Sequence, residues 1–406
     1  MPWARSANIW DCITQASAGP GGIMKKIDDQ RVVLRLEPGQ LYETKNRMRK
    51  KMACALIMLL MFASCHRNQS EEINGLKNAL FCVDGSENLG IYYKEIYSFK
   101  VNEMGEIFIS NFSSIRIDAY DRHGAYQCSV GSKGDGPGEF HTGVSVFACT
   151  REKIIAFDIS GKIIVFDKSG KLKKEKKISD IGISGHVLKI LAFADRLILY
   201  LLDKKKYWVA ILKSDLELDR LIATPIQDRK MPVRFQSDID VDDHGNMYIT
   251  DIYDYAIHVV DLNGKSVQSF KKEVKKSKFQ KEDFVVFYDN EIFRHPASER
   301  LKGLEKKDKY WPPICGINVD RQRIYVWRTD LSENGECLVD VYDDKWNYLR
   351  GFYCGNGLAE NFNFIKNNKV YKLSAKEPYS ADIIRQLGKF GKMSMPDQVC
   401  VYPVPE

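Results

Sequence analysis

The stretch from Ile96 to Phe140 constrains the fold more than any other part of the chain. It reads as a short strand, a Gly-containing turn, the strands IFIS and IRIDAYD, a His-Gly turn and the strand YQCSV, followed by a glycine-rich loop. Apolar and polar residues that alternate with period two, with turn residues roughly every 8 to 12 positions, indicate antiparallel β-strands. Four such strands in about 45 residues form one blade of a β-propeller.

The same pattern recurs down the chain, so we predict an all-β fold of four-stranded antiparallel blades. Further blades are predicted at 144–178, 187–222, 237–270 and 314–352. The polar turns after the third strands recur about every 46 to 48 residues in the first four blades. Residues from Phe362 onward and the terminal VCVYPV form a sixth blade, which we expect residues 80–93 to complete, because mixing strands from both chain ends leaves no open sheet edge. Six blades are predicted, with seven as the alternative, and residues 271–313 form an insertion.

A signal peptide is predicted at residues 48–64. Four basic residues from Arg47 to Lys51 precede the apolar run MACALIMLLMFAS, which ends in small residues. The run is shorter than the roughly 20 residues that span a bilayer. Ala63 and Ser64 before Cys65 resemble the lipobox of bacterial lipoproteins, and this resemblance implies that Cys65 is the lipidated first residue of the mature protein. The alternatives are an ordinary signal peptide or a short buried hydrophobic segment.

The signal peptide sets the expected domain organisation. Residues 1–47 are then an upstream translation artefact, with Met48 as the initiator, or else a disordered extension. Residues 65–79 are a polar tether to the propeller, which occupies residues 80–406. The net charge of +7 falls to about +2 when the 10 basic and 5 acidic residues of segment 1–65 are left out. A nearly neutral propeller gives no electrostatic reason to expect nucleic acid as a partner.

Three short sequences carry a resemblance to a known family. They are the corner FDKSG, the segment VDDHGNMYI and the loop GSKGDGPGEF. With these sequences the chain resembles six-bladed propeller lipoproteins related to the NHL and TolB-like propellers. The resemblance implies the fold, a lipid anchor and a place outside the inner membrane, in the outer membrane of the envelope, and it implies no catalytic set. The family loop, expected to be structural, comprises Gly134, Gly136, Pro137, Gly138, Glu139 and Phe140.

Other patterns that suggest chemistry have simpler explanations. The glycine-rich loop lies between strands and lacks a following Lys-Ser/Thr, so we interpret it as a connector between blades, not a phosphate-binding loop. The aspartates of DIDVDDHGN lack the glycine and glutamate of an EF-hand, and turn chemistry is favoured over a calcium site. After Cys65, seven cysteines remain without a C-x-x-C pair, which favours buried thiols with an occasional disulfide over a metal site. Catalytic residues, metal ligands and cofactors are predicted to be none.

The predicted function is therefore that of a lipid-anchored envelope propeller that binds a ligand or a protein. The membrane is the expected partner through the lipid, and a glycan, a peptide or an envelope protein is the expected ligand. Ligands of propellers usually lie at the mouth of the central funnel, which the insertion 271–313 is expected to shape. The alternative is a propeller hydrolase or lactonase-like enzyme with a metal site in the funnel. A third reading is a structural subunit of an envelope complex.

Overall fold

A computed structural model describes most of residues 78–405. The described ranges are 78–86, 91–93, 96–111, 114–141, 143–144, 146–204, 206–227, 237–251, 253–276, 310–331, 336–354, 363–374 and 398–405. Several predicted segments lie outside them, namely residues 1–47, the signal peptide 48–64, Cys65, tether residues 66–77 and residues 277–309 of the insertion.

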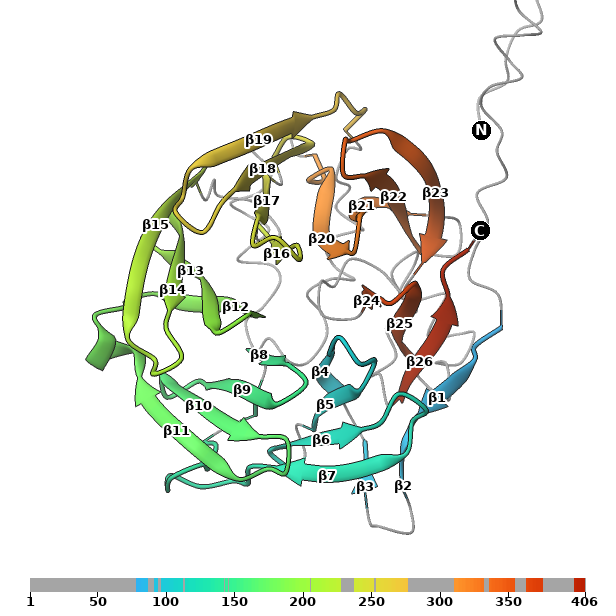
Figure 1. The fold of residues 1–406 in the computed structure, drawn as a ribbon. Coiled ribbons are helices and arrows are strands. Elements are labelled where there is room, and N and C mark those ends of the chain that lie inside the picture. The colour runs from blue at the N-terminus through green and yellow to red at the C-terminus, as the bar shows by residue number, and fades with distance from the viewer. Residues whose placement is uncertain are drawn as a thin grey trace, which may run out of the picture. The chain divides into compact units, whose positions relative to one another are not determined.

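Six four-stranded antiparallel sheets follow one another around a central axis (Figure 1). In each, the first strand is the innermost. Blade one contains β4 (Ile96–Val101), β5 (Ile107–Asn111), β6 (Arg116–Tyr120) and β7 (Tyr126–Val130). Blade two contains β8 (Val146–Cys149), β9 (Lys153–Asp158), β10 (Lys162–Asp167) and β11 (Leu172–Lys177), and a 3-10 helix, η3 (Ile178–Ile181), follows it. Blade three contains β12 (His186–Phe193), β13 (Arg196–Asp203), β14 (Lys206–Leu212) and β15 (Leu218–Gln227).

The remaining blades close the ring. Blade four contains β16 (Ile239–Val241), β17 (Met247–Asp251), β18 (Ala256–Val260) and β19 (Ser266–Lys271). Blade five contains β20 (Ile314–Asp320), β21 (Arg323–Leu331), β22 (Cys337–Asp343) and β23 (Tyr348–Cys354). Blade six contains β24 (Asn363–Lys366), β25 (Lys369–Ser374) and β26 (Gln398–Pro403), with β1 (Phe81–Val83) as its outermost strand. A separate pair, β2 (Gly85–Ser86) and β3 (Ile91–Tyr92), follows β1. The prediction of a six-bladed propeller with four-stranded antiparallel blades is confirmed.

The closing blade combines both ends of the described chain. β1 pairs antiparallel with β26, and in this register Phe81 lies opposite Val401 and Cys82 opposite Cys400. Cys82 and Cys400 also form a disulfide, with their Cα atoms 4.0 Å apart. The ring is therefore joined by backbone hydrogen bonds and by one covalent bond.

An aspartate organises the tight turn after the third strand in four of the blades. In blade one the Asp121 carboxylate accepts hydrogen bonds from the backbone N–H groups of His123 and Ala125, at 2.8 and 2.9 Å. Asp167, Asp261 and Asp343 repeat the arrangement in blades two, four and five. Such local bonds favour turns over continued strand, which explains why the repeat could be recognised from these corners.

The core lies between neighbouring blades, whose sheets pack face to face. Between blades one and two, Ile117 and Val130 of the first sheet share one buried cluster with Phe147 and Ile164 of the second. Phe140, in the connector between β7 and β8, is fully buried in the same cluster. The connector therefore supplies an apolar side chain to the interface between the blades.

Gly131, which begins this connector, is expected to be intolerant of substitution. Its φ is +74°, and a Cβ at this position would lie 2.2 Å from the Phe140 ring. Gly182 has a similar φ of +73° with nothing within 4 Å of its Cβ position. We expect Gly131→Ala to cost about 3 kcal/mol, from backbone strain plus overpacking, and Gly182→Ala only about 1 kcal/mol from the strain. Urea unfolding of both variants measures the difference, and equal losses would show that packing against Phe140 is unimportant.

Candidate functional site

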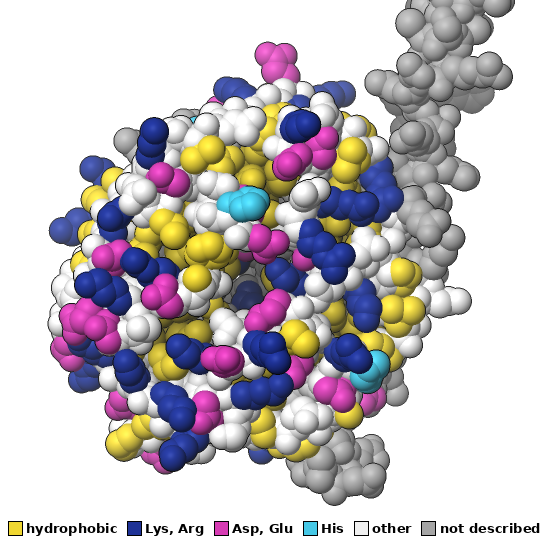
Figure 2. All heavy atoms as spheres, in the orientation of Figure 1, with side chains coloured by type: hydrophobic (Ala, Val, Ile, Leu, Met, Phe, Trp, Pro, Cys, Tyr) yellow, Lys and Arg dark blue, Asp and Glu magenta, His cyan; other side chains and the backbone are white. Residues whose placement is uncertain are grey.

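The innermost strands enclose a central channel. Each of β4, β8, β12, β16, β20 and β24 contacts the innermost strand of the next blade, and β24 contacts β4, so the circle is complete. Figure 2 shows a hollow at the centre of the ring, with basic and acidic side chains around it. Charged residues on or next to these strands include Lys100, Lys189, Asp238, Asp240, Asp320 and Lys366.

Two aspartates of blade four hold the innermost strand of blade five. Asp238 accepts a hydrogen bond from the backbone N–H of Ile317 at 3.0 Å, and Asp240 accepts one from Val319 at 2.7 Å. Both aspartates are buried. These carboxylates saturate N–H groups on the channel edge of β20, which no further strand can pair. Their first role is therefore structural.

The other aspartates of the DIDVDDHGN segment have different roles. Asp242 accepts hydrogen bonds from the N–H groups of His244 and Asn246, at 2.9 and 2.8 Å, as expected for turn chemistry. Asp243 lies in the same turn and borders a cleft between blades four and five. Turn chemistry thus accounts for Asp242, whereas Asp238 and Asp240 join two blades, which the sequence analysis did not anticipate.

Two lysines face this region of the channel. Lys189 Nζ donates to Asp238 Oδ1 at 2.8 Å. Lys100 has no carboxylate within ion-pairing distance among the described residues. Burial lowers the pKa of Lys100 to about 8, and the nearby positive charge of Lys189 lowers it further, against the weaker opposing effects of Asp238, Cys149 and Asp240. Lys100 is therefore a partly buried cation without a carboxylate partner among the described residues.

Neither lysine was predicted as a site residue, although the sequence contains a signal for both. Lys100 lies within IYSFKV and Lys189 within HVLKILAF, so each is a charged residue in the predicted first strand of a blade. In a propeller the first strand lies next to the axis, where a lysine is far from bulk solvent. A charged residue in that strand was thus a candidate site residue.

The family loop lies between β7 and β8, away from the channel lysines in sequence. Gly134 N–H donates to the Phe140 carbonyl at 3.0 Å, and Gly136 N–H donates to Glu139 Oε2 at 2.8 Å. Pro137 is exposed and Gly138 is buried. Glu175 on β11 accepts a hydrogen bond from Gly138 N–H at 2.8 Å. The Glu139 carboxylate thus closes its own loop, and its backbone carbonyl accepts a hydrogen bond from Lys162 of blade two at 3.2 Å.

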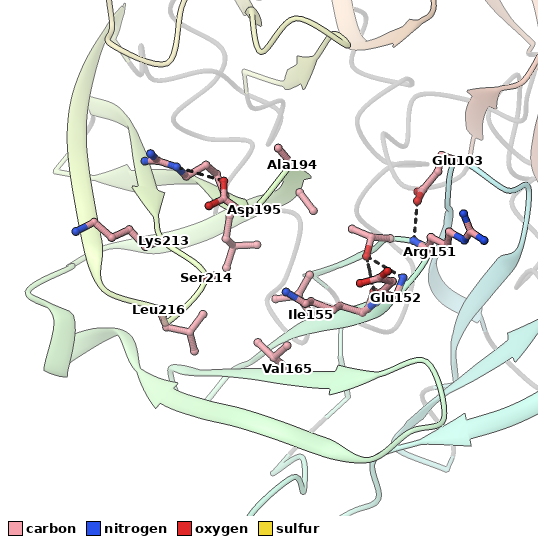
Figure 3. A pocket seen from close by; sticks show the side chains of 15 residues that line it. Glu103, Arg151, Glu152, Ile155, Val165, Ala194, Asp195, Lys213, Ser214 and Leu216 are labelled. Carbon is pink, nitrogen blue, oxygen red and sulfur yellow. Dashed lines mark hydrogen bonds and ion pairs between the residues drawn. The ribbon is translucent and has the colours of Figure 1, made fainter.

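A cleft of about 320 Å³ opens between blades two and three (Figure 3). Apolar side chains line part of it, among them Ile155, Val165 and Leu216, and charged turn residues surround them. One of these, Glu103 of blade one, accepts a hydrogen bond from the Arg151 N–H at 2.7 Å. The volume is at the low end for small-molecule sites. The cleft can admit a small apolar group, but it offers few converging polar groups to orient one.

Aromatic side chains of the type that stacks on sugar rings are mostly internal. Tyr255 is 1% exposed, and Tyr253, Trp311 and Trp327 are buried, whereas Tyr310 is 38% exposed. Trp327 Nε1 donates to Asn318 Oδ1 at 2.9 Å. Packing thus accounts for all of them except Tyr310.

Within the described ranges, no cluster of three or more His, Cys, Asp or Glu side chains is placed to hold a metal ion. The same ranges contain no helix that is long and apolar enough to cross a membrane.

Comparison with known proteins agrees on the fold. Residues 91–207 match a family model described as a 6-bladed beta-propeller. The chain is similar to the crystal structure of a Bacteroides fragilis protein described as a candidate exported protein, at 16% identity over 82% of this chain and 93% of that chain, with a TM-score of 0.45. It is also similar to Kluyveromyces lactis Hsv2, at 12% identity over 70% of this chain and 72% of that chain, with a TM-score of 0.39. No curated protein matches the chain. By its fold, then, the chain is a six-bladed β-propeller.

Proposed function

We propose that the protein is a lipid-anchored binding module of the cell envelope, with its ligand site in the central channel. The observation that carries the proposal is the state of the channel side chains. The Asp238 and Asp240 carboxylates are engaged by backbone N–H groups, while Lys100 has no partner in ion-pairing distance within the described ranges. A partly buried cation without a counter-ion favours a ligand that supplies hydrogen-bond acceptors.

The disulfide supports export. Disulfides persist in oxidising compartments and are rare in the cytosol, and Cys82 is linked to Cys400. The lipobox-like sequence before Cys65 supports a lipid anchor, and the corner and loop sequences support kinship with NHL and TolB-like lipoproteins. We propose the outer membrane as the location.

The anchor is tested by metabolic labelling with palmitate in an outer-membrane-containing bacterium. We expect the full chain to incorporate the label and Cys65→Ala to lose it entirely, because the thiol of Cys65 is the proposed attachment point. Cys128→Ser serves as a control for loss of a cysteine in the propeller. Equal labelling of the wild type and Cys65→Ala contradicts the anchor.

Ligand binding is tested by thermal shift of the detergent-solubilised full chain. The panel covers organic carboxylates, neutral oligosaccharides, peptides, lactones and divalent metal ions, because a ligand that binds only the folded state raises the apparent melting temperature. We expect at least one non-metal class to raise it, and Lys100→Met to remove that shift. A shift that requires calcium would instead favour the hydrolase alternative, and no shift with any class would contradict a small-ligand site.

A further inference from the structure

The chemistry of the channel ligand follows from the surroundings of Lys100. On one side of this lysine, β8 contributes Cys149 and β12 contributes Lys189, which forms an ion pair with Asp238. On the other side, β24 contributes Lys366, which lies 3.8 Å from Asp320. Lys189 and Lys366 therefore have carboxylate partners, and Lys100 is the channel lysine that lacks one within the described part of the chain.

The remaining carboxylate near Lys100 is already occupied. Asp240 accepts hydrogen bonds from the N–H groups of Val319 and Val241, at 2.7 and 3.0 Å. Turning it towards Lys100 would leave the Val319 N–H buried and unpaired, which is unfavourable. Asp240 thus acts on Lys100 only at longer range, and the ammonium group remains without a direct acceptor.

A second polar group on the same strand lacks a partner. Ser98 precedes Lys100 by two residues on β4, so the two side chains leave the same face of the strand. Ser98 is fully buried, and its Oγ makes no hydrogen bond within the described structure. Lys100 and the buried Ser98 hydroxyl thus share one face of β4, and neither has a direct side-chain partner within the described ranges.

We propose that the channel binds the carboxylate group of a small organic acid, with the Lys100 ammonium as its counter-ion. This inference deepens the proposed binding function and rests on it. Lys189 and Lys366 are each paired with an aspartate, which leaves the single positive charge of Lys100, so a ligand with one negative charge matches it better than a dianion such as phosphate. A carboxylate also forms short, charge-assisted hydrogen bonds with an ammonium group.

Binding is expected to depend on pH in a defined direction. A carboxylate favours charged Lys100, whose pKa in the free protein is about 8. As long as the ligand carboxylate stays ionised, affinity is therefore constant below that pH and falls about tenfold per unit above it, until the pKa of Lys100 in the complex is reached. Burial raises the pKa of the Cys149 thiol, so this neighbour does not titrate in the same range.

Isothermal titration calorimetry of the full chain tests the proposal, with acetate, lactate and glucuronate as probes. We expect at least one of them to bind to the wild type and to bind about 10- to 100-fold more weakly to Lys100→Met, which removes a hydrogen bond to a charged group. Lys100→Arg should retain binding but lose the pH dependence between pH 7 and 9.5, because arginine stays charged. Lys171→Met, at an exposed outer position, is the matched control and should bind like the wild type.

The outcomes separate this inference from the proposed function. Equal carboxylate binding by the wild type and Lys100→Met overturns the role of Lys100 and leaves a binding module. Tighter binding of phosphate or sulfate than of any carboxylate overturns the ligand class. Binding of neutral oligosaccharides or peptides alone overturns the carboxylate site but supports the binding function. If no class of compound binds, both the carboxylate site and the binding function are overturned.

The melting temperature of Lys100→Met shows whether Lys100 is structural. Because the substitution removes a partly buried charge without a counter-ion, the melting temperature should not fall, and a fall would mean that Lys100 is structural.

Discussion

Replacing both Cys82 and Cys400 by serine is expected to lower the free energy of unfolding by about 5 kcal/mol. The two cysteines are separated by 318 residues, so their disulfide encloses almost the whole propeller. A cross-link that closes so long a loop removes much conformational entropy from the unfolded chain. β1 is only three residues long. Without the covalent bond, ring closure depends on its short ladder with β26, on the contact between β24 and β4, and on the apolar cluster that blades six and one share.

Guanidinium unfolding of the oxidised wild type and of the double variant measures this loss. The double variant is preferable to a single one, which would leave a reactive thiol. Cys128→Ser is the control, because Cys128 is a free and partly exposed cysteine. Dithiothreitol added to the wild type should reproduce the loss, since it reduces the Cys82–Cys400 disulfide. A loss below about 1 kcal/mol would mean that strand pairing alone closes the ring.

The blade pattern could be read from the sequence because its signals are local. Asp167 and Gly170 in FDKSG, for example, specify a tight turn from within five residues. The corners at Leu216 and Trp346 adopt the same positive φ without glycine, with φ of 68° and 65°. The corner at Leu216 was recognisable because the repeat spacing placed a turn there, and the corner at Trp346 because it follows the third-strand sequence CLVDVYD. In a repeated fold, a turn that lacks the usual turn residues can thus still be predicted from its place in the repeat.

The channel could not be read in the same way, because its contacts join distant segments. Lys189 and Asp238 are 49 residues apart, and Asp240 and Val319 are 79 residues apart. Alternation along DIDVDD correctly indicates a strand, but it does not indicate which blade the carboxylates face. The Cys82–Cys400 pairing likewise depends on the ring being closed by both chain ends. Blade-by-blade alignment would have placed the charged first-strand residues next to the axis, but not their partners.

A buried cluster around Asp340 joins blades four and five. Asp340 is 1% exposed, and its Oδ2 accepts hydrogen bonds from the Tyr255 hydroxyl at 2.7 Å and from Lys272 Nζ at 3.2 Å. Arg328 Nη1 lies 3.5 Å from the same oxygen. Burial, together with the Asp340 carboxylate, raises the pKa of Tyr255 and Tyr342, so both hydroxyls remain protonated donors at neutral pH.

The same arrangement occurs in blade one, which supports a structural role. There Asp118 accepts a hydrogen bond from the Tyr93 hydroxyl at 3.0 Å, and the hydroxyls of Tyr93 and Tyr120 are 2.6 Å apart. Both clusters are encoded by the sequence D-x-Y-D on a third strand, beginning at Asp118 and at Asp340. A repeated arrangement at two interfaces between sheets is more consistent with joining the sheets than with a ligand site.

Asp340→Ala is therefore expected to cost about 3 kcal/mol, at the lower end for breaking a buried ion pair. The Lys272 side chain is 33% exposed and can turn to solvent, whereas Arg328 is 16% exposed and keeps Asp330 as its one carboxylate partner within the described ranges. Asp340→Asn, which keeps an acceptor for Tyr255, should cost about half as much, since it loses the charge but not the shape. Asp344→Ala changes an exposed carboxylate in the same blade and should cost less than about 0.5 kcal/mol. Urea unfolding of the three variants measures the loss of unfolding free energy in each. If Asp340→Ala loses no more than Asp344→Ala, then Lys272 and Arg328 reach solvent without penalty. Apolar packing alone would then join these blades.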